Sequence, residues 1–235
     1  MEFRVSKKFF ESVPNAMFGV VVVKNFNNRE SYEFIKKLLT ESIAACQKNY
    51  ENIKVKESGN IIPYREAFNK LGINPNKYMC SIEALITRIG KGNTIPSINP
   101  VVDLGNALSI KYTLPVGAHD IDKFDAKGIE IREAIETDEF IPFGSIEVEH
   151  PDLGETIYVS GSDVKTRRWT WRQGENSKIT EESKNIFFPI DGFSDFNKGN
   201  VLLLQKELAD ILSNNLNLEI KIGVVDKEHP VFTID

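Results

Sequence analysis

Three polar side chains mark the start of a predicted helix over residues 100–112. Asn99 suits the N-cap position, and Asp103 and Asn106 follow at helical spacing. This spacing places all three on one helix face, opposite the apolar residues of the segment. One carboxylate and two amides at a helix start can bind hydroxyls, amines or phosphate. The alternative is that Asn99 only caps the helix and Asp103 only complements its N-terminus.

A histidine lies in the loop that this helix feeds. His119 precedes Asp120, and a histidine beside an aspartate can act as a general base near neutral pH. The alternative is a solvated loop histidine. We predict His119 and Asp103 as the catalytic candidates, with Asn99 and Asn106 holding the substrate.

Arginines and tryptophans alternate in the stretch RRWTWRQ. In an extended strand Arg168 and Arg172 point to one face, and Trp169 and Trp171 point to the other. Two arginines on one face can hold phosphate or carboxylate groups. The tryptophans are either a stacking platform for bases or core packing. We predict that Arg168 and Arg172 contact RNA and that Trp169 contacts the substrate.

A further arginine, Arg65, lies in a predicted short helix. The simplest role for Arg65 is an ion pair with Glu83. The alternative is an RNA-binding line that runs from Arg65 through Lys77 to Arg88 and Lys91.

Composition restricts the class of protein. The chain has 235 residues, of which 41% are hydrophobic and 27% are charged, as in ordinary globular proteins. The net charge of −5 argues against a protein that coats nucleic acid non-specifically. It is compatible with RNA binding through a local basic patch. The longest apolar runs, such as residues 18–23, are too short to cross a bilayer.

The cysteines and histidines are few. Cys46 and Cys80 lack CxxC spacing, which argues against a disulfide scaffold and favours a reducing cytoplasm. His119, His150 and His229 form no metal-binding motif, so we predict neither a metal site nor a cofactor.

Helical and strand patterns alternate without a regular βαβ rhythm. We therefore predict an α+β fold, a mixed or antiparallel sheet with flanking helices. Residues 1–235 are expected to form one domain, with the best candidate loop at 138–154. The predicted helices cover residues 29–49, 63–71, 81–89, 100–112 and 201–212. The predicted strands cover residues 17–24, 156–160, 164–171, 185–191 and 218–225.

Several motifs together resemble the B3/B4 family, the editing region of the phenylalanyl-tRNA synthetase β subunit. The stretches YREAF, SIEAL, SINPVVDLGN followed by LPVG, and RRWTWRQ occur in the order typical of its short free-standing members. The resemblance covers residues 60–190 and leaves a C-terminal helix and strand in residues 191–235. It implies an aminoacyl-tRNA ligand and no amino-acid activation.

The resemblance implies a tRNA-binding hydrolase that deacylates mischarged aminoacyl-tRNA in trans, with the aminoacylated 3′ end as its ligand. The alternatives are a non-catalytic module that binds aminoacyl-tRNA or an amino acid, and a small-molecule amidase or amino-acid sensor. The family's histidine position falls on Gly117, which we include among the substrate-binding residues. Either His119 replaces that histidine from a new direction, or the editing geometry of the synthetase is absent.

Overall fold

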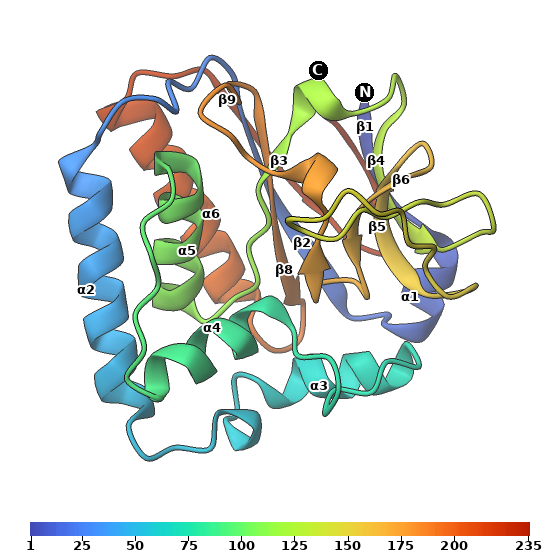
Figure 1. Cartoon of the computed structure of the whole chain (residues 1–235), viewed down its shortest axis with the longest axis horizontal. Helices are drawn as coiled ribbons and strands as arrows, with labels where there is room; N and C mark the ends of the chain where they lie inside the picture. The colour runs from blue at the N-terminus through green and yellow to red at the C-terminus, as the bar shows by residue number, and fades with distance from the viewer.

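The structure, a computed structural model, describes all 235 residues and contains two β-sheets, with the helices over residues 33–50, 100–112 and 198–210 on one side of them (Figure 1). The larger sheet has six strands in the order β10-β1-β4-β5-β6-β7, and the smaller has four in the order β3-β8-β2-β9. Strands β1 and β4 pair in parallel, and the other pairs are antiparallel. The predicted α+β class with mixed and antiparallel sheets is therefore confirmed.

The chain forms six α-helices, four short helical turns and ten strands. The α-helices are α1 (Lys7–Ser12), α2 (Glu33–Tyr50), α3 (Ile62–Lys70), α4 (Ser81–Gly90), α5 (Pro100–Tyr112) and α6 (Lys198–Asp210). Short helical turns are η1 (Val55–Glu57), η2 (Ile121–Lys123), η3 (Glu175–Ser177) and the π-helical η4 (Ile211–Asn215). The strands are β1 (Glu2–Val5), β2 (Ala16–Val23), β3 (His119–Asp120), β4 (Gly128–Glu133), β5 (Thr156–Ser160), β6 (Asp163–Arg167), β7 (Arg172–Gln173), β8 (Ile186–Phe193), β9 (Ile220–Val225) and β10 (Val231–Thr233).

Strands β2 and β8 form the centre of the molecule. Every residue of both strands is buried, because helices cover one face of the smaller sheet and the larger sheet covers the other. Their valine, isoleucine and phenylalanine content suits strands that are buried on both faces.

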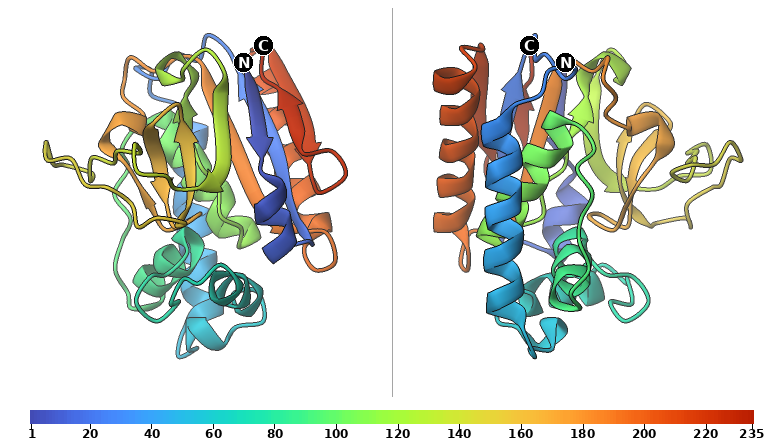
Figure 2. Two further views of the ribbon diagram at one scale, coloured as in Figure 1. Left: turned by 90° about the vertical axis from the view of Figure 1, so that its right-hand side faces the viewer. Right: turned by 60° about the vertical axis from the view of Figure 1, so that its left-hand side comes forward.

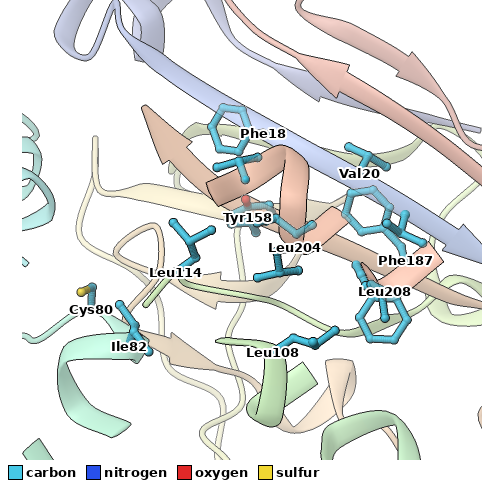
Figure 3. Packing of buried hydrophobic residues seen from close by; sticks show 14 of the residues in the cluster. Phe18, Val20, Cys80, Ile82, Leu108, Leu114, Tyr158, Phe187, Leu204 and Leu208 are labelled. Carbon is cyan, nitrogen blue, oxygen red and sulfur yellow. The ribbon is translucent and has the colours of Figure 1, made fainter. Parts of the chain in front are cut away.

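Aromatic rings join the two sheets. The ring of Phe3 in β1 lies 5.7 Å from that of Phe18 in β2 and 5.1 Å from that of Phe187 in β8. Tyr158 of β5 stacks on Phe3 at 6.1 Å, so it enters the same layer (Figure 3). Tyr158 thereby carries a phenolic hydroxyl into an otherwise apolar core.

The helical side is built on α5 and α6. Helix α6 packs on β2 and β8, α5 packs beside α6, and α2 covers α5. The first turn of α5 is capped twice, because Asn99 Oδ1 accepts from the Val102 amide at 3.1 Å and Asn28 Oδ1 accepts from the Val101 amide at 3.0 Å. These bonds satisfy amide groups that a helix start leaves free.

A proline leaves one ladder bond of β8 unmade on the side away from β2. Pro189 has no amide hydrogen, and its carbonyl accepts from the Gly117 amide at 2.9 Å. Apart from the two residues of β3, the segment that lies along this side of β8 is a loop. It comprises residues 115–118. The Asp191 amide donates to the Pro115 carbonyl at 3.0 Å and holds the loop in place. The Gly117–Pro189 pair therefore has one ladder bond where a regular antiparallel pair has two, whereas the Asp191 amide is bonded.

Most predicted elements are confirmed, several with shifted ends. The helix over residues 100–112 and the strand over 156–160 match in full, and the loop at 138–154 contains no helix or named strand. The helix predicted from residue 29 begins at Glu33. Strands β1, β3, β4, β7 and β10 and helix α1 were not among the predicted elements.

The strand predicted over residues 164–171 is wrong beyond Arg167. Arg168 and Trp169 both have left-handed backbone angles, with φ of 48° and 58°. This turn ends β6 at Arg167, and a new strand starts at Arg172. Arg168 and Arg172 therefore do not share a strand face, which removes the geometric basis of the paired-arginine prediction.

Gly192 permits close packing between β8 and α6. A methyl group at this position would lie 2.4 Å from Val201 Cγ2 and 2.8 Å from Asn197 Oδ1. We expect Gly192→Ala to lower the free energy of unfolding by about 1–3 kcal/mol, the usual cost of overpacking. Urea unfolding measures the change.

The matched control is Gly199→Ala in the first turn of α6, where an added methyl meets nothing within 4 Å. We expect this variant to be as stable as the parent or slightly more stable, since alanine restricts the unfolded chain. Equal stability of the two variants would contradict the packing of β8 on α6.

Candidate functional site

A small pocket lies where the loop before β3 meets β8. Its cavity volume is about 90 Å³. The walls come from α4, the loop before β3, strands β5 to β8 and the turn after β6. The lining residues include Ser81, Val116, Gly117, His119, Tyr158, Trp169, Thr170, Arg172, Gln173, Pro189 and Asp191. We call this cavity the Asp191 pocket.

Asp191 is the buried carboxylate of this pocket. It is only 2% exposed, and its Oδ1 accepts from the Tyr158 hydroxyl at 2.8 Å and from the Trp169 indole nitrogen at 2.6 Å. Both bonds end on Oδ1, which leaves Oδ2 free to interact with a ligand or water. The left-handed turn at Arg168 and Trp169 is what brings the indole to this carboxylate.

The protonation of Asp191 follows from its surroundings. Burial raises the pKa of its carboxyl to about 7, although the bonds from Tyr158 and Trp169 oppose the rise. No cation forms an ion pair with it. A carboxyl group that titrates near neutral pH can both accept and return a proton under physiological conditions.

His119 is a buried residue of β3. It is 2% exposed, its ring stacks on that of Tyr158 at 5.9 Å, and its Nδ1 has no hydrogen-bond partner. Burial, helped by the charge of Lys165, lowers the pKa of His119 to about 3. The alternative of a solvated loop histidine is wrong, because His119 is buried. The lowered pKa leaves the imidazole neutral and weakly basic at pH 7.

The absence of a side chain at Gly117 leaves space for the imidazole of His119. A methyl at Gly117 would lie 2.9 Å from Pro189 Cγ and 3.1 Å from His119 Nε2. A side chain at position 117 and the imidazole of His119 therefore compete for the same space. His119 enters the pocket from β3. Its role in binding or catalysis stays a prediction.

The polar residues predicted along α5 lie at two different places in the structure. Asp103 is buried and accepts from the Ser97 hydroxyl and from the Ile98 amide at 2.8 Å, so it fixes the chain before the helix. Asn99 caps the helix, and its amide nitrogen donates to the Ile179 carbonyl at 3.3 Å. Neither residue lines the Asp191 pocket. Asn106 lines a neighbouring cavity together with Gly117.

The predicted RNA-binding arginines differ in accessibility. Arg168 is 7% exposed, and its Nη2 lies 3.0 Å from Glu155 Oε2 and 3.1 Å from Asp152 Oδ2. Arg65 forms the ion pair with Glu83 at 2.6 Å. Only Arg172 is exposed, and it lies on the wall of the Asp191 pocket.

Trp169 is both a core residue and a pocket residue. Its ring is fully buried and lies 5.4 Å from that of Phe9, while its indole nitrogen donates to Asp191. It cannot serve as an exposed stacking platform. Trp171 is partly buried, with the guanidinium of Arg168 4.9 Å from its ring.

The sequence prediction omitted Asp191, Tyr158 and Thr170 from the site. Thr170 Oγ1 is buried without a hydrogen-bond partner at this pocket. One signal was present: Asp191 is the only charged residue in IFFPIDGF, and an isolated carboxylate in a buried strand is rare unless it is bonded. Tyr158 and Thr170 carried no comparable signal.

The comparison with protein families matches the B3/4 domain over residues 63–211. The chain therefore belongs to the B3/4 domain family, which confirms the resemblance seen in its motifs. No helix is long and apolar enough to span a membrane, and no group of three or more metal-binding side chains converges.

Among solved structures, the chain is similar to an N-terminal fragment of the phenylalanyl-tRNA synthetase β subunit from Pyrococcus horikoshii. The TM-score is 0.49 and the sequence identity is 11%. The match covers 93% of this chain and 49% of the fragment, so the chain spans about half the length of that relative. The comparison with curated proteins finds no match.

The two buried titratable groups affect stability in opposite directions. The folded state favours the proton on Asp191, so stability falls as pH rises from 3.8 to about 7. It disfavours the proton on His119, so stability rises with pH from about 3 to 6.5. Each slope is at most about 1.4 kcal/mol per pH unit, and the two cancel where they overlap.

Asp191→Asn removes the titration of Asp191 and leaves that of His119. Between pH 3.8 and 6.5 we therefore expect the free energy of unfolding of this variant, relative to the parent, to rise with pH. His119→Gln should show the reverse trend in the same window. Urea unfolding at several pH values measures both differences. Parallel curves for the parent and Asp191→Asn would show that Asp191 does not titrate in this range.

Proposed function

We propose that this chain binds the aminoacylated 3′ end of tRNA in the Asp191 pocket and hydrolyses mischarged aminoacyl esters in trans. The observation that carries the proposal is a buried carboxyl with a free oxygen in a small pocket. Membership of the B3/4 family supports the choice of ligand, because the motifs resemble an editing region. The proposed step needs only water and groups of this chain.

In the proposed reaction, ionised Asp191 takes a proton from water as the water oxygen attacks the ester carbonyl carbon. The bond between that carbon and the ribose oxygen then breaks, and the ribose oxygen receives the proton. The products are the free amino acid and tRNA with a free terminal hydroxyl. Tyr158 and Trp169 hold the carboxyl in one orientation and thereby serve as positioning residues.

The second candidate is a module that binds aminoacyl-tRNA without hydrolysing it. It is favoured by the state of the two residues that the sequence predicted as catalytic. Asp103 is engaged in bonds before α5, and His119 is neutral with a pKa of about 3. Asp191 is therefore the residue on which the choice between enzyme and binding module depends.

We expect the purified protein to deacylate at least one member of a panel of mischarged tRNAs. Asp191→Asn should lower kcat by about 100-fold or more, the usual scale for a general base, with little change in KM. The amide keeps an oxygen that accepts from Tyr158 and Trp169, so the fold should survive.

The matched control is Asp195→Asn, because Asp195 is exposed just beyond β8. Its activity should equal that of the parent. Binding of the panel without any hydrolysis would establish the non-catalytic module. Undiminished activity of Asp191→Asn would exclude Asp191 as the base.

The size of the Asp191 pocket restricts the amino acid. A cavity of about 90 Å³ is smaller than the roughly 150 Å³ that holds a benzene ring in a protein core. We therefore expect tRNA charged with glycine, alanine or serine to be hydrolysed faster than tRNA charged with phenylalanine or tyrosine. Initial deacylation rates on the same tRNA measure the preference.

Gly117→Ala should reduce activity further by narrowing the pocket beside Pro189 and His119. The control Gly59→Ala adds a methyl that meets nothing within 4 Å, so it should leave the rates unchanged. Equal rates for the alanyl and tyrosyl esters would contradict the size restriction.

A further inference from the structure

The loop between β4 and β5, residues 134–155, projects from the body of the molecule and exposes apolar side chains beside carboxylates (Figure 2). Its exposed large apolar residues are Ile135, Phe143, Ile146, Val148 and Leu153. The loop contains no lysine or arginine, and the exposed Glu136, Glu139 and Glu147 take part in no ion pair of the chain. Apolar groups that gather at an exposed place commonly mark a contact surface. The unpaired carboxylates indicate that the surface it contacts is positively charged.

The tip of this loop, residues 145–149, is held at both ends. The Gly144 amide donates to Glu175 Oε2 at 2.8 Å, and the Glu149 amide donates to the Phe140 carbonyl at 2.7 Å. Between these bonds Ile146 and Val148 flank Glu147, and Ile146 is 94% exposed. The tip therefore presents two apolar side chains and one carboxylate on a backbone that loses little freedom when it binds.

A groove lies elsewhere on the surface, between the chain around η1 and helix α4. Its volume is about 410 Å³, which is within the range of pockets that take a ligand. Its apolar walls include Ile53, Val55 and Met79. Ile53 and Met79 are themselves exposed, so part of the apolar wall is open to a partner.

The uncompensated charge of this groove is positive. Lys56 and Lys91 line it, are exposed and take part in no ion pair of the chain. The other charged residues of the groove form ion pairs, Lys54 with Glu57 at 3.4 Å and Glu83 with Arg65 at 2.6 Å. The groove thus offers apolar contact together with two unpaired cations, which complements the tip of the β4–β5 loop.

The same lysines could contact RNA, since Lys91 ends the RNA-binding line considered from the sequence. That line is interrupted in the structure. Arg65 is paired with Glu83, and Arg88 Nε donates to the Thr94 carbonyl at 2.8 Å. Apolar walls beside the lysines suit an apolar and acidic protein segment better than a sugar–phosphate backbone.

The loop and the groove lie far apart on one molecule. Figures 1 and 2 show α4 and the chain around residue 55 at the lower end in every view, while the β4–β5 loop projects from the side. A chain therefore cannot place its own loop in its own groove. Two loops that faced each other would bring carboxylates together, which disfavours a symmetric contact between loops.

We propose that a second copy of this chain inserts residues 145–149 into the groove between η1 and α4. The apolar side chains of the tip contact the apolar walls, and Glu147 pairs with Lys56 and Lys91. The contact is heterologous, because the loop of one copy meets the groove of the other. It is smaller than a standard interface, so we expect an association constant in the micromolar range or weaker, and a further weakening as salt is added.

The test is sedimentation equilibrium of the full chain over a concentration series. Glu147→Lys and Lys91→Glu each place like charges at the contact, so each should weaken self-association about 10-fold or more. An equimolar mixture of the two variants should associate again, because Glu147→Lys supplies an intact groove and Lys91→Glu supplies an intact loop. Ile146→Ser leaves the charge unchanged and should weaken association through the lost apolar contact.

The matched controls are Lys227→Glu and Glu228→Lys. These make the same charge reversals at adjacent exposed positions between β9 and β10. Both should associate like the parent, and urea unfolding checks that every variant folds.

Three results would overturn the inference. The first is a parent that stays monomeric into the hundreds of micromolar. The second is self-association that Lys91→Glu leaves unchanged, and if this variant weakens tRNA binding instead, the groove serves RNA. The third is a mixture of Glu147→Lys and Lys91→Glu that associates no better than either variant alone.

Discussion

The carboxyl group of Asp191 lies between the two sheets, where the residue is 2% exposed, and one of its oxygens accepts from side chains of β5 and of the turn after β6. Strand β8 places Asp191 on the same face as Phe187, toward the larger sheet. Tyr158 reaches it from β5, and Trp169 reaches it from the turn that ends β6. A left-handed backbone at two consecutive residues is unfavourable for side chains other than glycine, and here it directs the indole to the carboxylate.

The same constraint shapes the cavity around this group. Pro189 removes one ladder bond on the side of β8 that faces residues 115–117, and both Pro189 and Asp191 line the Asp191 pocket beside this segment. The absence of a side chain at Gly117 lets His119 enter, and its imidazole stays neutral because it is buried. A carboxyl that is buried without a neighbouring cation destabilises the folded state when it ionises. Groups with such perturbed pKa values are common at functional sites.

The sequence predicted the elements with strong periodicity and missed those without it. Helix α5 was predicted to the residue, because Asn99, Pro100 and the apolar stripe all indicate the same helix. Strand β1 and helix α1 are short, and their stability comes from packing against distant strands. The end of β6 was missed because RRWTWR alternates like a strand, whereas the bond from Trp169 to Asp191 requires a turn.

The candidate site shows a similar division. His119, Gly117, Trp169 and Arg172 were named from the sequence and line one pocket. Asp103 and Asn99 were also named, but their polar atoms bond to the chain around the start of α5. Asp191 is adjacent to these residues only in space, through long-range pairing of β8, so spacing along the chain could not place it in the site.

The most direct measurement is a crystal structure with a non-hydrolysable alanyl-adenosine, in which an amide replaces the ester. The account predicts the amide carbonyl beside Oδ2 of Asp191, close enough for one water between them. A well-defined ligand elsewhere on the protein, with the Asp191 pocket filled by water alone, would contradict it.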